Sequence, residues 1–187
     1  MEEQKRETFV TVAAVGGRYR WVAVTSLFLA IGMILRLVSP SIAGISPNWL
    51  ISMYCLSILI LRPGLAQAAG IGLVAGALCV ATSKAIFPYA NFGSELAGAL
   101  VCAMMVKNPL LEIGFLKKIR PLLCGLVSTL VSGFTFVTLT KLVMAVPMPV
   151  YLYGMLPVVL TVGLVNCIVT QLLYFPAQRL FGNTGLK

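Results

Sequence analysis

The sequence contains no histidine, and only 10% of its 187 residues are charged. The lack of imidazole excludes Ser-His and Cys-His catalytic pairs, histidine metal sites and the HExxH zinc proteases. Soluble globular proteins carry about 25% charged residues. Because 59% of the residues are hydrophobic, the chain has too few polar side chains to cover a surface in water. The lipid bilayer has to be its solvent.

Metal and nucleotide motifs are also missing. Five cysteines each lie inside an apolar run, without a CxxC or CxxxC spacing: Cys55, Cys79, Cys102, Cys124 and Cys167. This pattern is typical of small packing residues and not of zinc ligands or disulfides. The phosphate-binding pattern GxxxxGK[ST] is absent, so the chain does not hydrolyse ATP itself. Without histidine or paired carboxylates at membrane depth there is almost no acid–base machinery, and we predict neither a cofactor nor an enzymatic activity.

Six apolar runs dominate what is present. They cover residues 21–38, 48–61, 65–83, 92–106, 121–143 and 155–177. A straight span needs about 20 residues, so 48–61 and 92–106 are either tilted full spans or partial helices that line a cavity. We favour full spans, because an even number of crossings fits the charge distribution. The sequence predicts an all-α integral membrane bundle of about six transmembrane helices over residues 21–181, with a leader at 1–20 and a tail at 182–187.

The basic residues predict how the bundle is oriented. If the N-terminus is cytosolic, 11 of the 14 Lys and Arg residues are cytosolic, and only Arg36, Lys84 and Lys141 approach the other face. Since Lys and Arg are concentrated in cytosolic loops, both termini are predicted to lie in the cytosol. The net charge of +9 is dispersed between apolar runs. Nucleic-acid binding needs a clustered basic surface, so we predict no nucleic-acid partner.

Ionisable groups at membrane depth are candidates for a binding site, because each is costly unless it is paired or hydrated. Arg36, Lys84 and Lys141 fall near the outer ends of their helices, counted at about 1.5 Å per residue. Glu95, the only carboxylate outside the cytosolic segments, lies on the same face. One interpretation is that Glu95 forms ion pairs that tie helix ends together. The other is that this cluster binds a small molecule that carries a carboxylate.

Aromatic and amide groups accompany the charges, most densely at 87–95. This segment is either an ordinary interfacial loop or a pocket wall that stacks a flat ligand. Asn166, near the middle of the last run, either bonds a neighbouring helix or faces the ligand, whereas Gln171 is expected to pack helices. The candidate ligand-binding residues are Arg36, Asn48, Trp49, Lys84, Tyr89, Asn91, Glu95 and Asn166.

Small residues recur at four-residue spacing on the first helix, where Gly32 follows Ser26 and Ala30. The run at 65–83 is also rich in Ala and Gly. Such spacing lets helices approach closely. It indicates either packing inside the bundle or a smooth face that docks another membrane protein.

Several segments together resemble a known family. They are the small-residue stripe at 24–32, the segments 44–48 and 87–88, and 165–166 with 174–176. With six predicted helices, the chain resembles the substrate-binding S components of energy-coupling factor (ECF) vitamin importers, and within them the tryptophan-transporter (TrpP-like) family. The resemblance implies a protein of the bacterial cytoplasmic membrane that captures a small molecule outside. It also implies docking through the first helix on a membrane coupling protein driven by two ATPase subunits. Ser26 and Ala30 occupy the positions of the Ala-x-x-x-Ala docking pattern of that family, with serine in place of the first alanine.

For a tryptophan-like ligand, Arg36 or Lys84 would meet the carboxylate and Glu95 the ammonium. The stacking groups would be Tyr89, Phe92 and Trp49, and Asn91 or Asn166 would bond the indole nitrogen. The alternative is a gradient-driven carrier that acts alone, with Glu95 as its one titratable carboxylate in the membrane.

Overall fold

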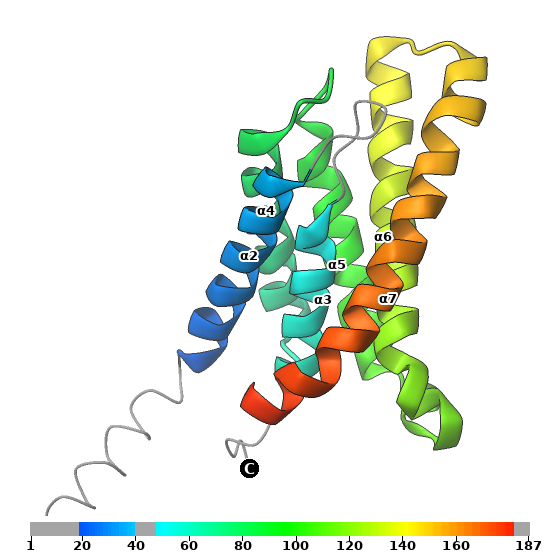
Figure 1. Cartoon of the computed structure of the whole chain (residues 1–187). Helices are drawn as coiled ribbons and strands as arrows, with labels where there is room; N and C mark the ends of the chain where they lie inside the picture. Colours follow the sequence, from blue (N-terminus) through cyan, green and yellow to red (C-terminus); the bar gives the residue numbers. More distant parts are fainter. Residues whose placement is uncertain (1–18, 40–47, 182–187) are drawn as a thin grey trace, which may run out of the picture.

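The computed structural model describes residues 19–39 and 48–181, and this part of the chain is a bundle of helices (Figure 1). The helices are α2 (Arg20–Val38), α3 (Trp49–Leu61), α4 (Leu65–Thr82), α5 (Ala90–Lys107), α6 (Gly114–Met144) and α7 (Leu156–Phe181). A 3-10 helix, η1 (Pro109–Glu112), precedes α6, and a π-helical segment, η2 (Val150–Met155), leads into α7. The described residues contain no β-strand, which confirms the predicted all-α fold with six helices. Nearly all of the predicted leader and the whole predicted tail lie outside these residues.

The helices extend beyond the apolar runs at several ends. The run expected at 121–143 belongs to a helix that begins at Gly114, and α5 has 18 residues, about 27 Å of helix. Charged residues can continue the backbone hydrogen bonding of a helix outside the membrane, so an apolar run marks only the membrane-embedded part of that helix. Four helices are long and apolar enough to cross a bilayer, namely α2, α4, α6 and α7 with η2. The protein is therefore a multi-pass membrane protein.

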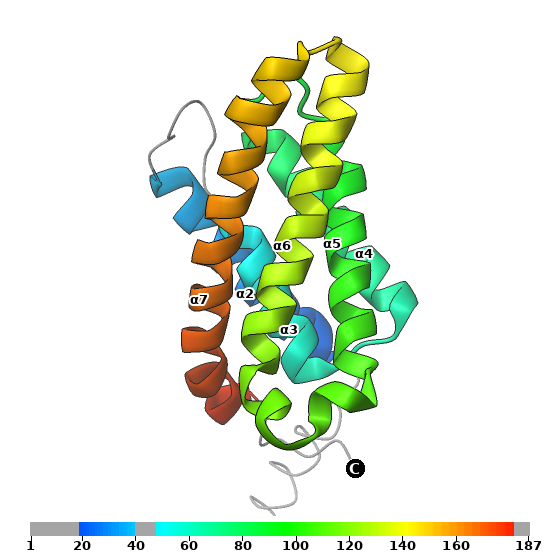
Figure 2. The ribbon, with the colours of Figure 1, turned by 90° about the vertical axis from the view of Figure 1, so that its right-hand side faces the viewer.

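The short helix α3 lies at the centre of the bundle and contacts all five other α-helices (Figures 1 and 2). Its residues 50–59 are all buried. Because α3 is enclosed by protein, it has no separate lipid-facing side, which explains why it is apolar all round. For the same reason it can be short, at only 13 residues. It ends at Arg62, whose positive φ of 48° closes the helix before Pro63.

The start of α2 and the end of α7 lie at the same end of the bundle, here called the terminal end (Figure 1). There the Arg20 guanidinium donates a hydrogen bond to the backbone oxygen of Phe181. Phe28 packs edge-on against the Phe181 ring, with the ring centroids 5.5 Å apart. These contacts join the first and last described helices. The other end, called the opposite end, holds the C-terminus of α2 and the connection between α6 and α7.

Close approach of α4 to α5 depends on Gly72. A Cβ added there would lie 2.8 Å from the Glu95 carbonyl oxygen and from the Leu96 Cα, whereas a Cβ at Gly70 meets nothing within 4 Å. We expect Gly72→Ala to lower the free energy of unfolding by about 1–3 kcal/mol, the cost of overpacking. Gly70→Ala, on another face of the same helix, should not destabilise the protein, since alanine is the better helix former. Thermal unfolding in detergent measures both, and equal effects would contradict this account.

Candidate ligand-binding site

A cavity of about 110 Å³ lies between the helices in the half of the bundle toward the opposite end. Helices α2, α3, α5, α6 and α7 contribute to its wall, together with the segments just before α3 and just after α4. The lining residues are Arg36, Asn48, Ile51, Ser83, Lys84, Ala85, Asn91, Ser94, Glu95, Thr129, Ser132, Gly133, Phe136, Val137, Val158, Val159 and Val162. Five of the eight residues predicted from the sequence are among them: Arg36, Asn48, Lys84, Asn91 and Glu95. The cavity thus combines a polar group of side chains with an apolar wall from α6 and α7.

Glu95, in the second turn of α5, is the most enclosed charged group of the cavity, with 1% of its surface exposed. Its Oε1 accepts a hydrogen bond from Asn48 Nδ2, and the Cys79 thiol lies 3.8 Å from the same oxygen. No described residue donates a hydrogen bond to Oε2 or lies within ion-pair distance. The interpretation that Glu95 ties helix ends by ion pairing is therefore not supported among the described residues. One carboxylate oxygen is left for another donor.

The two cations of the cavity come from different elements. Arg36, near the end of α2, is half-buried, and its Nε atom is buried without a hydrogen-bond partner among the described residues. Lys84, just after α4, is exposed. The expectation that Lys141 joins them is wrong, because its Nζ lies 5.1 Å from the Tyr151 ring centroid and it does not line the cavity. Two cations and one carboxylate surround the space.

Among the predicted amides, Asn48 and Asn91 reach the cavity and Asn166 does not. Asn91 donates to the Pro88 carbonyl oxygen at 2.7 Å, which orients its side chain at the start of α5. Asn166 is fully buried and donates to the Asn48 carbonyl oxygen and to Thr129 Oγ1, both at 3.2 Å. Asn166 therefore links α7 to α3 and α6 behind the cavity wall. Of its two predicted roles, the structure supports bonding to neighbouring helices.

The family of this chain follows from a comparison with protein-family models. The model of the tryptophan transporter TrpP matches residues 18–181. The chain belongs to the TrpP family. This confirms the resemblance to an ECF S-component family found in the sequence. Searches of curated proteins and of solved structures find no match. Membrane transport of tryptophan is thus the function of the family in which this cavity occurs.

The aromatic residues predicted to stack a ligand lie elsewhere in this TrpP family member. Trp49 donates from Nε1 to Ser39 Oγ at 2.6 Å and does not line the cavity. Tyr89 is 65% exposed and packs edge-on against Phe87, with centroids 6.1 Å apart. Phe92 is 39% exposed. None of the three predicted stacking residues, Trp49, Tyr89 and Phe92, lines the cavity. They lie where interfacial anchors are expected.

The cavity's aromatic residue is Phe136 of α6, which sequence reasoning missed. A signal for it exists in the sequence. Cavity-lining residues on α6 recur every three or four positions: Thr129, Ser132, Gly133, Phe136 and Val137. This spacing marks one helix face, and the face combines small, polar and aromatic residues. A face of that composition near the predicted charges is a candidate binding surface.

The predicted docking pair lies on the outside of the bundle. Ser26 and Ala30 are both exposed on α2. Ser26 also lines a groove between α2 and α4, to which Gly70 contributes.

The packing role predicted for Gln171 of α7 is confirmed. Its side chain donates to the Lys118 carbonyl oxygen and accepts from the Leu122 amide of α6, both at 3.0 Å.

Proposed function

We propose that the protein is the substrate-capture subunit of an ECF-type importer that binds tryptophan, or a similar flat heteroaromatic compound, from outside the cell. The main support for this proposal is the buried Glu95 carboxylate. One of its oxygens has no hydrogen-bond partner among the described residues, and it shares a cavity with Arg36 and Lys84. An amino acid carries an ammonium and a carboxylate on one carbon. A site with one carboxylate and two cations complements both groups. The proposed role is binding and transport, without catalysis.

The ring of the ligand is expected against the apolar side of the cavity. Phe136 and three valines of α7, Val158, Val159 and Val162, form this side. The cavity volume of about 110 Å³ is below the roughly 300–1,000 Å³ of typical small-molecule pockets. Binding therefore requires some wall segments to move apart. The contact between Gly133 and Val159 brings α6 and α7 close beside the cavity, so separation of these two helices would make room for the ring.

Phe136→Ala is expected to weaken tryptophan binding about tenfold or more, because burying an aromatic contact contributes about 1.5–3 kcal/mol. Phe134→Ala is the matched control, since Phe134 lies two residues away on α6, is 40% exposed and does not line the cavity. Isothermal titration calorimetry on the two purified variants measures the difference. Similar losses in both would remove Phe136 from the site.

The proposed topology has both termini in the cytosol of a bacterial cell and the cavity toward the outside. The distribution of the described basic residues supports it. At the terminal end lie Arg20, Arg62, Lys107, Lys117, Lys118, Arg120 and Arg179, whereas Arg36, Lys84 and Lys141 lie toward the opposite end. Lys and Arg favour the cytosolic side of a membrane protein. A cavity at the opposite end then receives its ligand from the external medium.

Energy for uptake is proposed to come from a membrane coupling protein with two ATPase subunits. The chain has no ATP-binding motif of its own, and the exposed Ser26 and Ala30 offer a smooth face on α2 for close helix contact. The second candidate is a gradient-driven carrier, favoured by the enclosed, titratable Glu95.

Lipid vesicles that contain only this protein distinguish the two mechanisms. We expect them to bind radiolabelled tryptophan but not to accumulate it when a proton or sodium gradient is imposed. Accumulation that collapses with the gradient would establish the carrier and overturn the coupled mechanism. Absence of any tryptophan binding would overturn both.

A further inference from the structure

The connection between α5 and α6 forms an elbow at the terminal end, defined here as residues 107–118 (Figures 1 and 2). Its apolar side chains have little of the bundle to pack against. Leu110, Ile113 and Phe115 are 63%, 64% and 72% exposed. Large apolar side chains that are exposed in a connection at the end of a membrane bundle are suited to the boundary between lipid headgroups and acyl chains.

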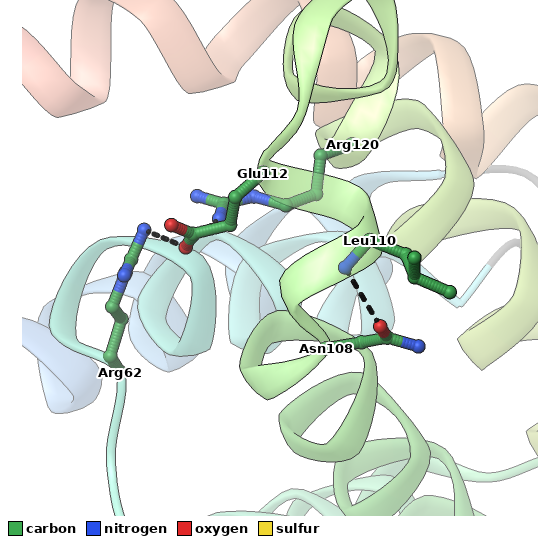
Figure 3. A network of polar contacts seen from close by, with 5 residues as sticks. All are labelled: Arg62, Asn108, Leu110, Glu112 and Arg120. Atoms are coloured by element: carbon green, nitrogen blue, oxygen red, sulfur yellow. Dashed lines mark hydrogen bonds and ion pairs between the residues drawn. The ribbon is translucent and has the colours of Figure 1, made fainter.

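The elbow also carries positive charge that no described residue neutralises. Lys107, Lys117 and Lys118 are all exposed, and no described residue forms an ion pair with them. The elbow's one carboxylate, Glu112, is engaged elsewhere: its Oε1 lies 2.7 Å from an Arg62 nitrogen and 3.0 Å from one of Arg120 (Figure 3). Within the described part of the chain, these three cations are therefore without a counter-charge.

The backbone of the elbow is held in place on both sides. Asn108 Oδ1 accepts a hydrogen bond from the Leu110 amide at 3.0 Å, which fixes the start of η1 (Figure 3). The Gln171 side chain of α7 bonds the Lys118 carbonyl oxygen at 3.0 Å. These contacts hold the backbone near the two ends of the elbow, a single segment of 12 residues that carries both the exposed apolar side chains and the exposed lysines.

We infer that the elbow is a binding surface for anionic phospholipids. Apolar side chains inserted at the acyl boundary, with lysines that extend to the phosphate level, are the chemistry of an interfacial membrane anchor. The elbow joins two helices of a membrane bundle, so it meets the lipid headgroups next to that bundle. A free inorganic anion would use the lysines alone and would leave the exposed Ile113 and Phe115 unexplained. The lipid accounts for both groups.

The test compares lipid selectivity in charge variants. Purified full-length protein in neutral detergent is titrated with phosphatidylglycerol or phosphatidylcholine, and bound lipid is counted by native mass spectrometry. One lysine near an anionic surface contributes about fivefold to affinity. Lys117→Gln with Lys118→Gln should therefore reduce the preference for phosphatidylglycerol at least tenfold. Lys141→Gln, toward the opposite end, should leave that preference unchanged.

Two further measurements distinguish lipid binding from the binding of other ligands. Phe115→Ser retains every charge and should weaken binding of both lipids, and inorganic phosphate should not displace phosphatidylglycerol. Displacement by phosphate would identify a simple anion site and overturn the proposal. So would an unchanged preference in the double lysine variant, or an equal loss in Lys141→Gln. If the double variant kept its lipid preference but lost transport in cells, the elbow would instead be a protein-docking surface. Tryptophan binding enters none of these outcomes, so they do not depend on the proposed substrate.

Discussion

Glu95→Gln is expected to weaken tryptophan binding by one to two orders of magnitude. Glutamine keeps the length of the side chain and its contact with Asn48, but it removes the negative charge that we propose binds the ligand's ammonium group. Hydrogen bonds to charged groups contribute about 1.5–3 kcal/mol, and each 1.36 kcal/mol corresponds to about tenfold in affinity. Isothermal titration calorimetry with purified protein measures the change directly.

The same substitution at the terminal end is the control for this experiment. Glu112→Gln removes one negative charge outside the cavity, so tryptophan affinity per folded molecule should stay unchanged. Glu95→Gln itself should not reduce stability, because it removes a buried charge that has no ion-pair partner among the described residues. Unchanged tryptophan affinity in Glu95→Gln would refute the assignment of Glu95 as the ammonium-binding group.

Glu112→Gln is expected instead to destabilise the fold, by about 2 kcal/mol. Arg120 is 3% exposed, and its guanidinium donates to Glu112 Oε1 at 3.0 Å (Figure 3). Removing the carboxylate leaves a buried cation without its counter-charge, which costs about 3–5 kcal/mol in a fully buried pair. The cost is smaller here because 42% of the Glu112 side chain is exposed. Unfolding monitored by thermal denaturation in detergent gives the difference.

Two variants separate the buried ion pair from the exposed one. Arg62→Gln breaks the other contact of Glu112, and because 51% of the Arg62 side chain is exposed, the loss should stay within about 1 kcal/mol. Adding Arg120→Met to Glu112→Gln removes the stranded cation and should recover most of the lost stability. A double variant no more stable than Glu112→Gln alone would show that the buried charge is not the cause.

Much of the fold is predictable from the sequence because the bilayer imposes a simple rule on the chain. Long apolar runs have to be helical to satisfy their backbone hydrogen bonds, and all six predicted helices are present. The rule fails where a helix leaves lipid: α6 begins at Gly114 and passes through Lys117 and Lys118 before the apolar run. It also says nothing about which helix lies inside. The central position of α3 depends on contacts between distant segments.

The charged part of the site was predictable for a similar physical reason. Arg36, Lys84 and Glu95 are costly at membrane depth, which made them conspicuous in an apolar sequence, and all three line the cavity. Aromatic residues carry no such signal. Tyr89 lies in a connection and Phe136 inside an apolar run. Neither is costly in a membrane, so the packing of α5, α6 and α7 decides which of them lines the cavity.

The enclosed position of α3 has a consequence for how the protein is made. The Ser57 hydroxyl of α3 pairs with Thr25 of α2 at 2.6 Å, and Ser52 donates to the backbone oxygen of Asn166, in the last helix, at 3.3 Å. Asn166 in turn holds the Asn48 carbonyl oxygen at the start of α3. During synthesis, Asn48 and α3 therefore lack these contacts until the ribosome has made α7. We therefore expect ligand binding to require that α7 has been synthesised and has packed against α3.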